Sequence, residues 1–369
     1  MKQPIPSQGI NRLRYLSLAG IFLALVVIVL GAYTRLVDAG LGCPDWPGCY
    51  GFAMVPHTEA RLSLALERFP DAPVDWHKGW AEMVHRYVAG LLLVLISTLV
   101  VIALRRARQE PMPVGLVTGL LALVITQALF GMWTVTLKLW PQVVTAHLLG
   151  GFATLSLLLL LYLRLRPLPP PVAAAQRSRL RSFRPWALGG LVLVVAQIAL
   201  GGWTSSNYAA LACTDFPTCQ GSFWPRMDFP QGFDLLQQVG PNYLGGLLES
   251  EARTAIHMTH RLGALLVLVY LAVLLARLWR GTAGTGLRPV AAAVAAALLL
   301  QISLGLSNIF WLLPLPVAVA HNAGGALLLL SLVWLNQRLF IATEGTASAE
   351  AQVEEKTVHE NNHRIPVHL

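Results

Sequence analysis

Long runs of apolar residues alternate with short polar segments along most of this chain. A membrane-spanning helix needs about 20 mainly apolar residues, because each helical residue advances about 1.5 Å across a hydrocarbon layer of about 30 Å. The runs that meet this length predict eight spans, at 15–33, 81–104, 114–135, 143–165, 185–204, 253–277, 288–310 and 315–337. The pattern therefore predicts an all-α integral membrane protein with two long polar connections, at 34–80 and 205–252.

The composition agrees with a lipid environment. Of the 369 residues, 55% are hydrophobic and 12% are charged, with a mean hydropathy of +0.59. A soluble domain carries about 25% charged residues. The formal net charge of +9 would suggest a nucleic-acid partner in a soluble protein. Here the basic residues lie in short loops between apolar runs. This position indicates that they hold the loops in the cytoplasm, and we expect no nucleic-acid partner.

The positions of arginine near the span ends predict the orientation of the chain. Basic residues gather beside both termini and in every second loop, where they tend to remain in the cytoplasm. They are Arg12, Arg14, Arg105, Arg106, Arg108, Arg164, Arg166, Arg177, Arg179, Arg181, Arg184, Arg277, Arg280, Arg288 and Arg338. We therefore expect both termini to be cytoplasmic and the two long connections to face outward.

Four sequence blocks occur twice, in the same order. "GAYTRLVDAGLGCPDWPGC" at 31–49 corresponds to "GGWTSSNYAALACTDFPTC" at 201–219, an offset of 170. The other pairs, at offsets of 174 or 175, are "EMVHR" with "HMTHR", "QALFGMW" with "QISLGLS", and "TAHLLGG" with "VAHNAGG". With four spans in each half, this is a parallel repeat about an axis along the membrane normal. We expect two repeated four-helix bundles.

The repeat also predicts the limits of the parts of the chain. The N-terminal half is placed at 10–166 and the C-terminal half at 185–339. A basic, proline-rich cytoplasmic linker is expected at 167–184, and a disordered cytoplasmic tail at 340–369.

Histidines inside the spans are the main candidates for chemistry, because an ionisable group in a membrane is costly and is kept for function. His85 and His147 in the first half match His260 and His321 in the second, all in the outer third of the membrane. Two imidazoles on different helices of one bundle suit a haem, with one ring on each side of the iron. Zinc or copper would usually recruit a cysteine, a carboxylate or a third histidine. A hydrogen bond to a neighbouring helix is the structural alternative.

The residues beside these histidines allow two interpretations each. Arg86 and Arg261 directly follow His85 and His260, where they are candidates to pair with haem propionates or to reach the lipid headgroups. Gly150–Gly151 and Gly324–Gly325 follow the other two histidines. These glycines admit a bulky ring or serve close helix packing.

The two halves differ at one acidic position. Glu82 lies three residues before His85, on the same helical face, and its counterpart is His257. We therefore expect chemistry in the first half and a permanent electron-transfer haem in the second, with His257 as a non-ligand. The alternative is that Glu82 is an interfacial carboxylate without a role.

Cysteines repeat with the spacing C-x5-C in the two long connections. On an oxidising outer face, Cys43–Cys49 and Cys213–Cys219 are expected to form two local disulfides. A structural staple is the favoured role. A redox role during cofactor handling and a four-thiolate metal site are the alternatives.

The ordered motifs resemble those of the haem A synthase family. The resemblance rests on "EMVHR", "TAHLLGG", the second "HR", "AHNAGG" and the C-x5-C pairs, and it covers nearly all of 10–340. It implies an enzyme that oxidises the C8 methyl of haem O, through successive hydroxylations, to the formyl group of haem A for terminal oxidases. It implies haem O as substrate on His85 and His147, haem b as cofactor on His260 and His321, and Glu82 as the functional acid. It also implies a multi-pass protein of the bacterial inner membrane that meets a haem O synthase and a redox partner.

Two other functions fit parts of the pattern. A di-haem b-type membrane cytochrome that transfers electrons from quinol would share the four histidines. Parallel repeats also occur in transporters, which favour broken helices and polar residues near the midplane. In this chain the polar residues gather in the outer third instead. The pigments bound to the protein discriminate between the enzyme and the cytochrome.

Overall fold

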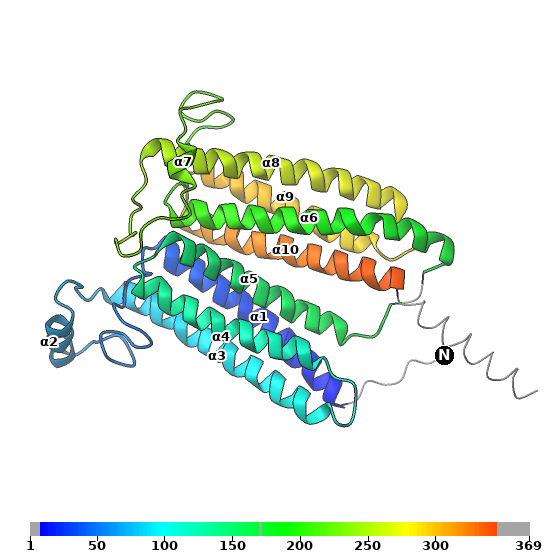
Figure 1. Cartoon of the computed structure of the whole chain (residues 1–369), viewed down its shortest axis with the longest axis horizontal. Coiled ribbons are helices and arrows are strands. Elements are labelled where there is room, and N and C mark those ends of the chain that lie inside the picture. Colours follow the sequence, from blue (N-terminus) through cyan, green and yellow to red (C-terminus); the bar gives the residue numbers. More distant parts are fainter. Residues whose placement is uncertain (1–7, 170–171, 345–369) are drawn as a thin grey trace, which may run out of the picture.

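The computed structural model describes residues 8–169 and 172–344, and every regular element in these ranges is a helix (Figure 1). Among the described residues, eight helices are long and apolar enough to cross a membrane. They are α1 (Gln8–Leu36), α3 (Trp76–Arg106), α4 (Val114–Thr136), α5 (Pro141–Arg164), α6 (Ala174–Ser206), α8 (Ser250–Gly281), α9 (Arg288–Phe310) and α10 (Leu315–Glu344). The expected all-α membrane fold is thus confirmed. The short helices α2 (Glu59–Arg68) and α7 (Phe229–Gly232) lie in the two long connections.

The spanning helices pack in two groups (Figure 1). In the first group, α1 contacts α3 and α5, and α4 contacts the same two helices. In the second group, α6 contacts α8 and α10, and α9 contacts α8 and α10. Helices α1 and α5 of the first group meet α6 and α10 of the second. This packing is what two successive bundles require, while the functional division into halves stays a prediction.

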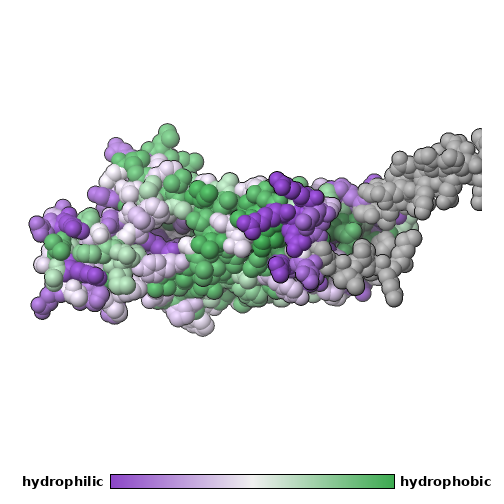
Figure 2. Space-filling model, turned by 90° about the horizontal axis from the view of Figure 1, so that it is seen from below, coloured by the Kyte–Doolittle hydropathy of each residue, from purple (hydrophilic) through white to green (hydrophobic). Residues whose placement is uncertain are grey.

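The surface separates apolar from polar residues along the helix axes. Figure 2 shows a broad hydrophobic region over the middle of the helices, with hydrophilic residues towards both ends. The spans carry exposed leucines and valines, such as Leu91, Val94 and Leu299. In lipid such side chains are in their preferred solvent, so their exposure needs no partner protein.

The segment 167–184, predicted as a linker, is partly helical. Helix α6 begins at Ala174, so the second part of this segment, with its arginines, is helical. The extension is held against α10, because Arg184 pairs with Glu344 at 2.9 Å and Arg181 donates to the carbonyl of Thr343 at 3.3 Å. The length of an apolar run predicts only the part of a helix that lies within the hydrocarbon layer. The helical hydrogen bonds of the backbone can continue beyond that part.

The predicted tail at 340–369 also starts too early. Helix α10 continues to Glu344, and Thr343 is buried against the helices. The rest of the predicted tail, 345–369, lies outside the described residues.

The two long connections lie at one end of the helices, where hydrogen bonds join the two groups. Arg35 at the end of α1 donates to the carbonyl of Ser205 on α6 at 2.6 Å, and the Tyr208 hydroxyl donates to Asp38 at 2.7 Å. The connection before α8 crosses to the first group, where the Tyr243 amide donates to the carbonyl of Lys138 at 3.1 Å. The outer ends of the two groups are therefore tied together.

Candidate haem-binding site

The four repeat-matched histidines lie on four different helices in two pairs. His85 on α3 and His147 on α5 interact electrostatically with each other. His260 on α8 and His321 on α10 do the same. All four rings are partly buried between helices. The structure thus brings each predicted pair together within its own group of helices.

Each imidazole rests against a glycine on a neighbouring helix. A β-carbon at Gly31, Gly201 or Gly305 would lie 3.0, 3.3 or 3.2 Å from a ring carbon of the facing histidine. At Gly131 the corresponding distance to His147 would be 3.6 Å. Side chains at the first three positions would displace the rings, so glycine there lets the imidazole reach the helix backbone. Sequence reasoning missed these four glycines, although each lies in or beside a repeated block.

In the described part of the chain, three of these four rings have an unpaired nitrogen that a metalloporphyrin can use, a feature that His257 shares. Within the described ranges, the buried Nδ1 atoms of His85, His147 and His321 have no hydrogen-bond partner. A neutral imidazole offers one lone pair, and two such rings supply both axial ligands of a haem iron. No group of three or more His, Cys, Asp or Glu residues in 8–169 and 172–344 is placed to hold a metal ion. The donor set is therefore two imidazoles per site, which fits haem.

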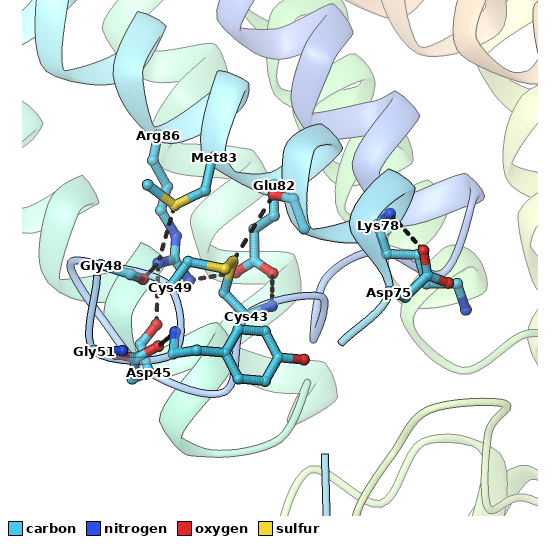
Figure 3. Close-up of a disulfide and its surroundings, with 12 residues drawn as sticks. Cys43, Asp45, Gly48, Cys49, Gly51, Asp75, Lys78, Glu82, Met83 and Arg86 are labelled. Carbon is cyan, nitrogen blue, oxygen red and sulfur yellow. Dashed lines mark hydrogen bonds and ion pairs between the residues drawn. A yellow bond between two sulfur atoms is a disulfide. The ribbon is translucent and has the colours of Figure 1, made fainter. Parts of the chain in front are cut away.

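Glu82 is buried on α3, one turn before His85 (Figure 3). Its Oε2 accepts a hydrogen bond from the Cys43 amide at 2.9 Å, and its Oε1 forms an ion pair with Arg86. Both oxygens are engaged by groups that stabilise the ionised form. The carboxylate is therefore fixed between the histidine helix and the first disulfide loop.

Arg86 and Arg261 anchor the two disulfide loops. The guanidinium of Arg86 donates to the carbonyls of Asp45, Pro47 and Gly48, the first two at 3.0 and 3.2 Å. Arg261 donates to the carbonyls of Asp215 and Thr218, each at 2.9 Å, and of Cys213 at 2.8 Å. The structure gives these side chains a use that sequence reasoning missed. Their pairing with haem propionates stays a prediction.

We expect Arg86→Met to destabilise the protein more than Arg261→Met. Both changes leave loop carbonyls unpaired, but only the first also leaves the buried Glu82 carboxylate without its cation. Breaking a buried ion pair in this way costs about 3–5 kcal/mol. Thermal unfolding of the purified protein in detergent measures the difference. Equal melting temperatures for the two variants would contradict this account of the Glu82–Arg86 pair.

The expected disulfides Cys43–Cys49 and Cys213–Cys219 are present. In both loops an aspartate closes the turn after the second cysteine. Asp45 accepts from the amides of Tyr50 and Gly51 at 2.6 and 2.7 Å. Asp215 accepts from the amides of Gln220 and Gly221 at 2.7 and 3.0 Å and from the Thr218 hydroxyl at 2.6 Å. The loops are thus organised by side-chain hydrogen bonds as well as by covalent bonds.

The hydrogen bonds to Asp215 make the second loop sensitive to acid. The Thr218 hydroxyl and backbone amides lower the pKa of this carboxyl from 3.8 to about 2. Because the folded loop prefers the ionised form, its stabilisation is complete above pH 3.8 and is lost as the pH falls through 2. We expect the Gln220 and Gly221 amides to lose hydrogen-exchange protection across this interval, relative to unstructured peptides. Asp215→Asn should remove this pH dependence. Unchanged protection of the wild-type amides at pH 2 would contradict the role given to the Asp215 carboxylate.

His257 occupies the place that Glu82 has in the first group. It is buried on α8, interacts electrostatically with Arg261 four residues later, and bonds to the backbone of Ala209. Glu82 differs in forming an attractive ion pair with Arg86 and in accepting from the Cys43 amide, whereas an arginine cannot form an ion pair with a histidine. That His257 is not a ligand stays a prediction. The acid–base properties of the two sites differ accordingly.

Comparison with known proteins gives one family. Residues 14–333 match the COX15-CtaA family model, described as cytochrome oxidase assembly protein. The chain is 44% identical to the heme A synthase of Shewanella oneidensis over 323 residues, which cover 88% of the chain and 95% of the relative. The heme A synthase of Caulobacter vibrioides is 28% identical, over 82% of the chain and 89% of the relative. That of Rhodospirillum centenum is 29% identical, over 86% and 84%.

Proposed function

The chain belongs to the COX15-CtaA family of cytochrome oxidase assembly proteins, and we propose that it is a haem A synthase. The enzyme is a membrane oxidoreductase that converts haem O to haem A by oxidising the C8 methyl group to a formyl group. The observation that carries this function is the coexistence of two imidazole pairs with one buried carboxylate, beside the first pair only. The close relatives named heme A synthase support the same reaction.

The two pairs have different roles in this proposal. His85 and His147 would hold haem O, the substrate. His260 and His321 would hold haem b, the cofactor, which would supply a one-electron redox centre. The asymmetric placement of Glu82 and His257 supports the assignment of chemistry to the first site.

Glu82 is the proposed catalytic residue of the first site. When the formyl oxygen comes from water, oxidation of a methyl group to a formyl group releases protons and passes its electrons to the redox partner. A fixed carboxylate accepts a proton or stabilises developing positive charge. Arg86 and the Cys43 amide hold both carboxylate oxygens in place, so the group is oriented before the substrate binds. The disulfide loop thereby fixes the carboxylate through the Cys43 amide, and helix α3 fixes its position relative to His85.

The protein is a multi-pass inner-membrane protein. We place both termini in the cytoplasm, because the basic residues cluster at that end of the helices. The start of α1 and the end of α10 lie at the opposite end of the molecule from the two long connections (Figure 1). Haem O carries a long isoprenoid chain, and sites between lipid-facing helices suit such a substrate. A haem O synthase as donor and a separate redox partner complete the proposed pathway of haem and electrons.

The test is expression in a bacterial host that makes haem O but no haem A. Chromatography of the total membrane haem should then show haem A or its hydroxylated precursor. A host membrane that still contains only haem b and haem O, although the protein is present and folded, would overturn the proposal. That result would favour the di-haem cytochrome, which shares the four histidines but leaves haem unaltered.

A further inference from the structure

Three of the four glycines beneath the histidine rings are preceded, four residues earlier, by glutamine. The three segments are "QALFG" at 127–131, "QIALG" at 197–201 and "QISLG" at 301–305. The fourth is "VIVLG" at 27–31, on the helix that supports His85. One turn of helix separates the two positions, so each glutamine lies directly below its glycine and close to the imidazole. The His85 ring alone has valine there.

A second position changes together with the first. Gly150, Gly263 and Gly324 lie three residues after His147, His260 and His321. A β-carbon at any of these glycines would overlap the amide of the facing Gln127, Gln197 or Gln301. The glycine therefore makes the room that the glutamine amide occupies. Three residues after His85 stands Val88. Three of the histidines therefore have a glutamine and a glycine at these two positions. His85 has Val27 and Val88 instead.

The amides contact the histidines of the second site directly. Nε2 of Gln197 lies 3.0 Å from Nδ1 of His260 and also donates to the His260 carbonyl at 2.8 Å. Nε2 of Gln301 lies 3.3 Å from Nε2 of His321. In the part of the chain that the structure describes, the buried Oε1 atoms of all three glutamines have no partner. A buried acceptor is costly to leave unpaired. Turning the amide over exchanges Nε2 and Oε1, so that Oε1 accepts the ring N–H and the other ring nitrogen keeps its lone pair for iron.

His85 has a weaker set of contacts. Its ring bonds to the backbone of Val27, as the His321 ring bonds to the backbone of Gln301, but His85 lacks the side-chain amide that also contacts His321 in the described helices. Partners of a ligating histidine fix the orientation of its ring, and their loss usually lowers metal affinity 10–100-fold. The His85 ring is therefore free to turn away from an iron at lower cost than the other three.

We propose that Val27 and Val88 make His85 the exchangeable ligand, so that the first site releases its haem while the second retains it. This inference rests on the proposed function, in which the first site must take up haem O and release haem A. Gln127, Gln197 and Gln301 act as positioning residues for the three firmly held histidines. The difference between a substrate site and a cofactor site is then encoded in a valine pair in place of glutamine and glycine.

The test measures the rate at which haem leaves the purified protein for an excess of apomyoglobin. The wild type should release haem in two phases, the fast phase from the first site. Val27→Gln with Val88→Gly installs the missing amide and its space, and should slow the fast phase about tenfold. The matched control, Val27→Met with Val88→Gly, has the same length of side chain and the same space without the amide. It should leave the fast phase unslowed.

A reciprocal variant keeps the test decisive if the first one does not fold. Gln197→Met should accelerate the slow phase about tenfold and shift the electron paramagnetic resonance of the second haem. Release in a single phase from the wild type, or equal rates for the glutamine and methionine variants, would overturn the inference. The haem A content of host membranes measures the oxidation separately from haem release. A protein that releases haem as described but makes no haem A would contradict the proposed function and not the inference about Val27 and Val88.

Discussion

His260→Ala or His321→Ala should remove the tightly held haem together with its bis-imidazole absorption spectrum. Each change deletes one axial ligand, and the partner imidazole alone cannot maintain six-coordinate iron. Loss of a supporting residue already costs 10–100-fold in affinity, so loss of the ligand itself should exceed about 100-fold. Haem content per protein and the reduced-minus-oxidised spectrum of the purified variants measure the effect.

The control for this prediction is His57→Ala, because His57 is exposed in the first long connection and is not one of the four paired histidines. It should leave the haem content unchanged. A protein that retains full haem content and the same spectrum after both His260→Ala and His321→Ala would refute the assignment of the second site. Variants His85→Ala and His147→Ala should preserve the second haem, since their helices belong to the other group.

Glu82→Gln should abolish the oxidation of haem O in a protein that still folds and keeps both imidazole pairs. The lost ion pair with Arg86 should lower the melting temperature, but Arg86 retains the loop carbonyls of Asp45 and Pro47 as partners. The amide has nearly the same shape and still offers an oxygen to the Cys43 amide, but it carries no charge and accepts no proton. Loss of a general acid or base typically lowers a rate by 10²–10⁴-fold, so we expect a decrease of about 100-fold or more. The ratio of haem A to haem O in host membranes measures it.

Glu59→Gln is the matched control, because Glu59 is an exposed carboxylate on α2, away from the histidine helices. Its haem A yield should equal that of the wild type. An unchanged yield in the Glu82 variant would show that this carboxylate serves only the disulfide loop. A variant that loses its second haem as well would point to damaged packing and not to lost chemistry.

The membrane architecture was predictable because lipid imposes one simple rule on the sequence. Every backbone polar group must be satisfied inside a helix, so length and apolar composition locate the spans. All eight predicted spans correspond to helices. The rule does not locate the ends of helices in water or interface. The helices therefore extend beyond the predicted spans, at the start of α6, where arginines continue the helix, and at the end of α10 at Glu344.

The candidate site was only partly predictable. Internal repetition identified the paired histidines and cysteines, because a repeated polar residue in an apolar segment stands out. Contacts between distant segments left no such signal. The carbonyls of Asp45 and Pro47 that bind Arg86, and the position of His85 against Gly31, require the packed structure. The loop contact of Arg86 explains why an arginine directly follows the histidine without invoking a haem.

The most direct test of the account is chromatography of the pigments bound to the purified wild-type protein from a host that makes haem O. The account predicts haem b together with haem O, its hydroxylated product or haem A, because one site holds a cofactor and the other a substrate. Haem b alone at both sites in such a host, or a folded protein without haem, would contradict it.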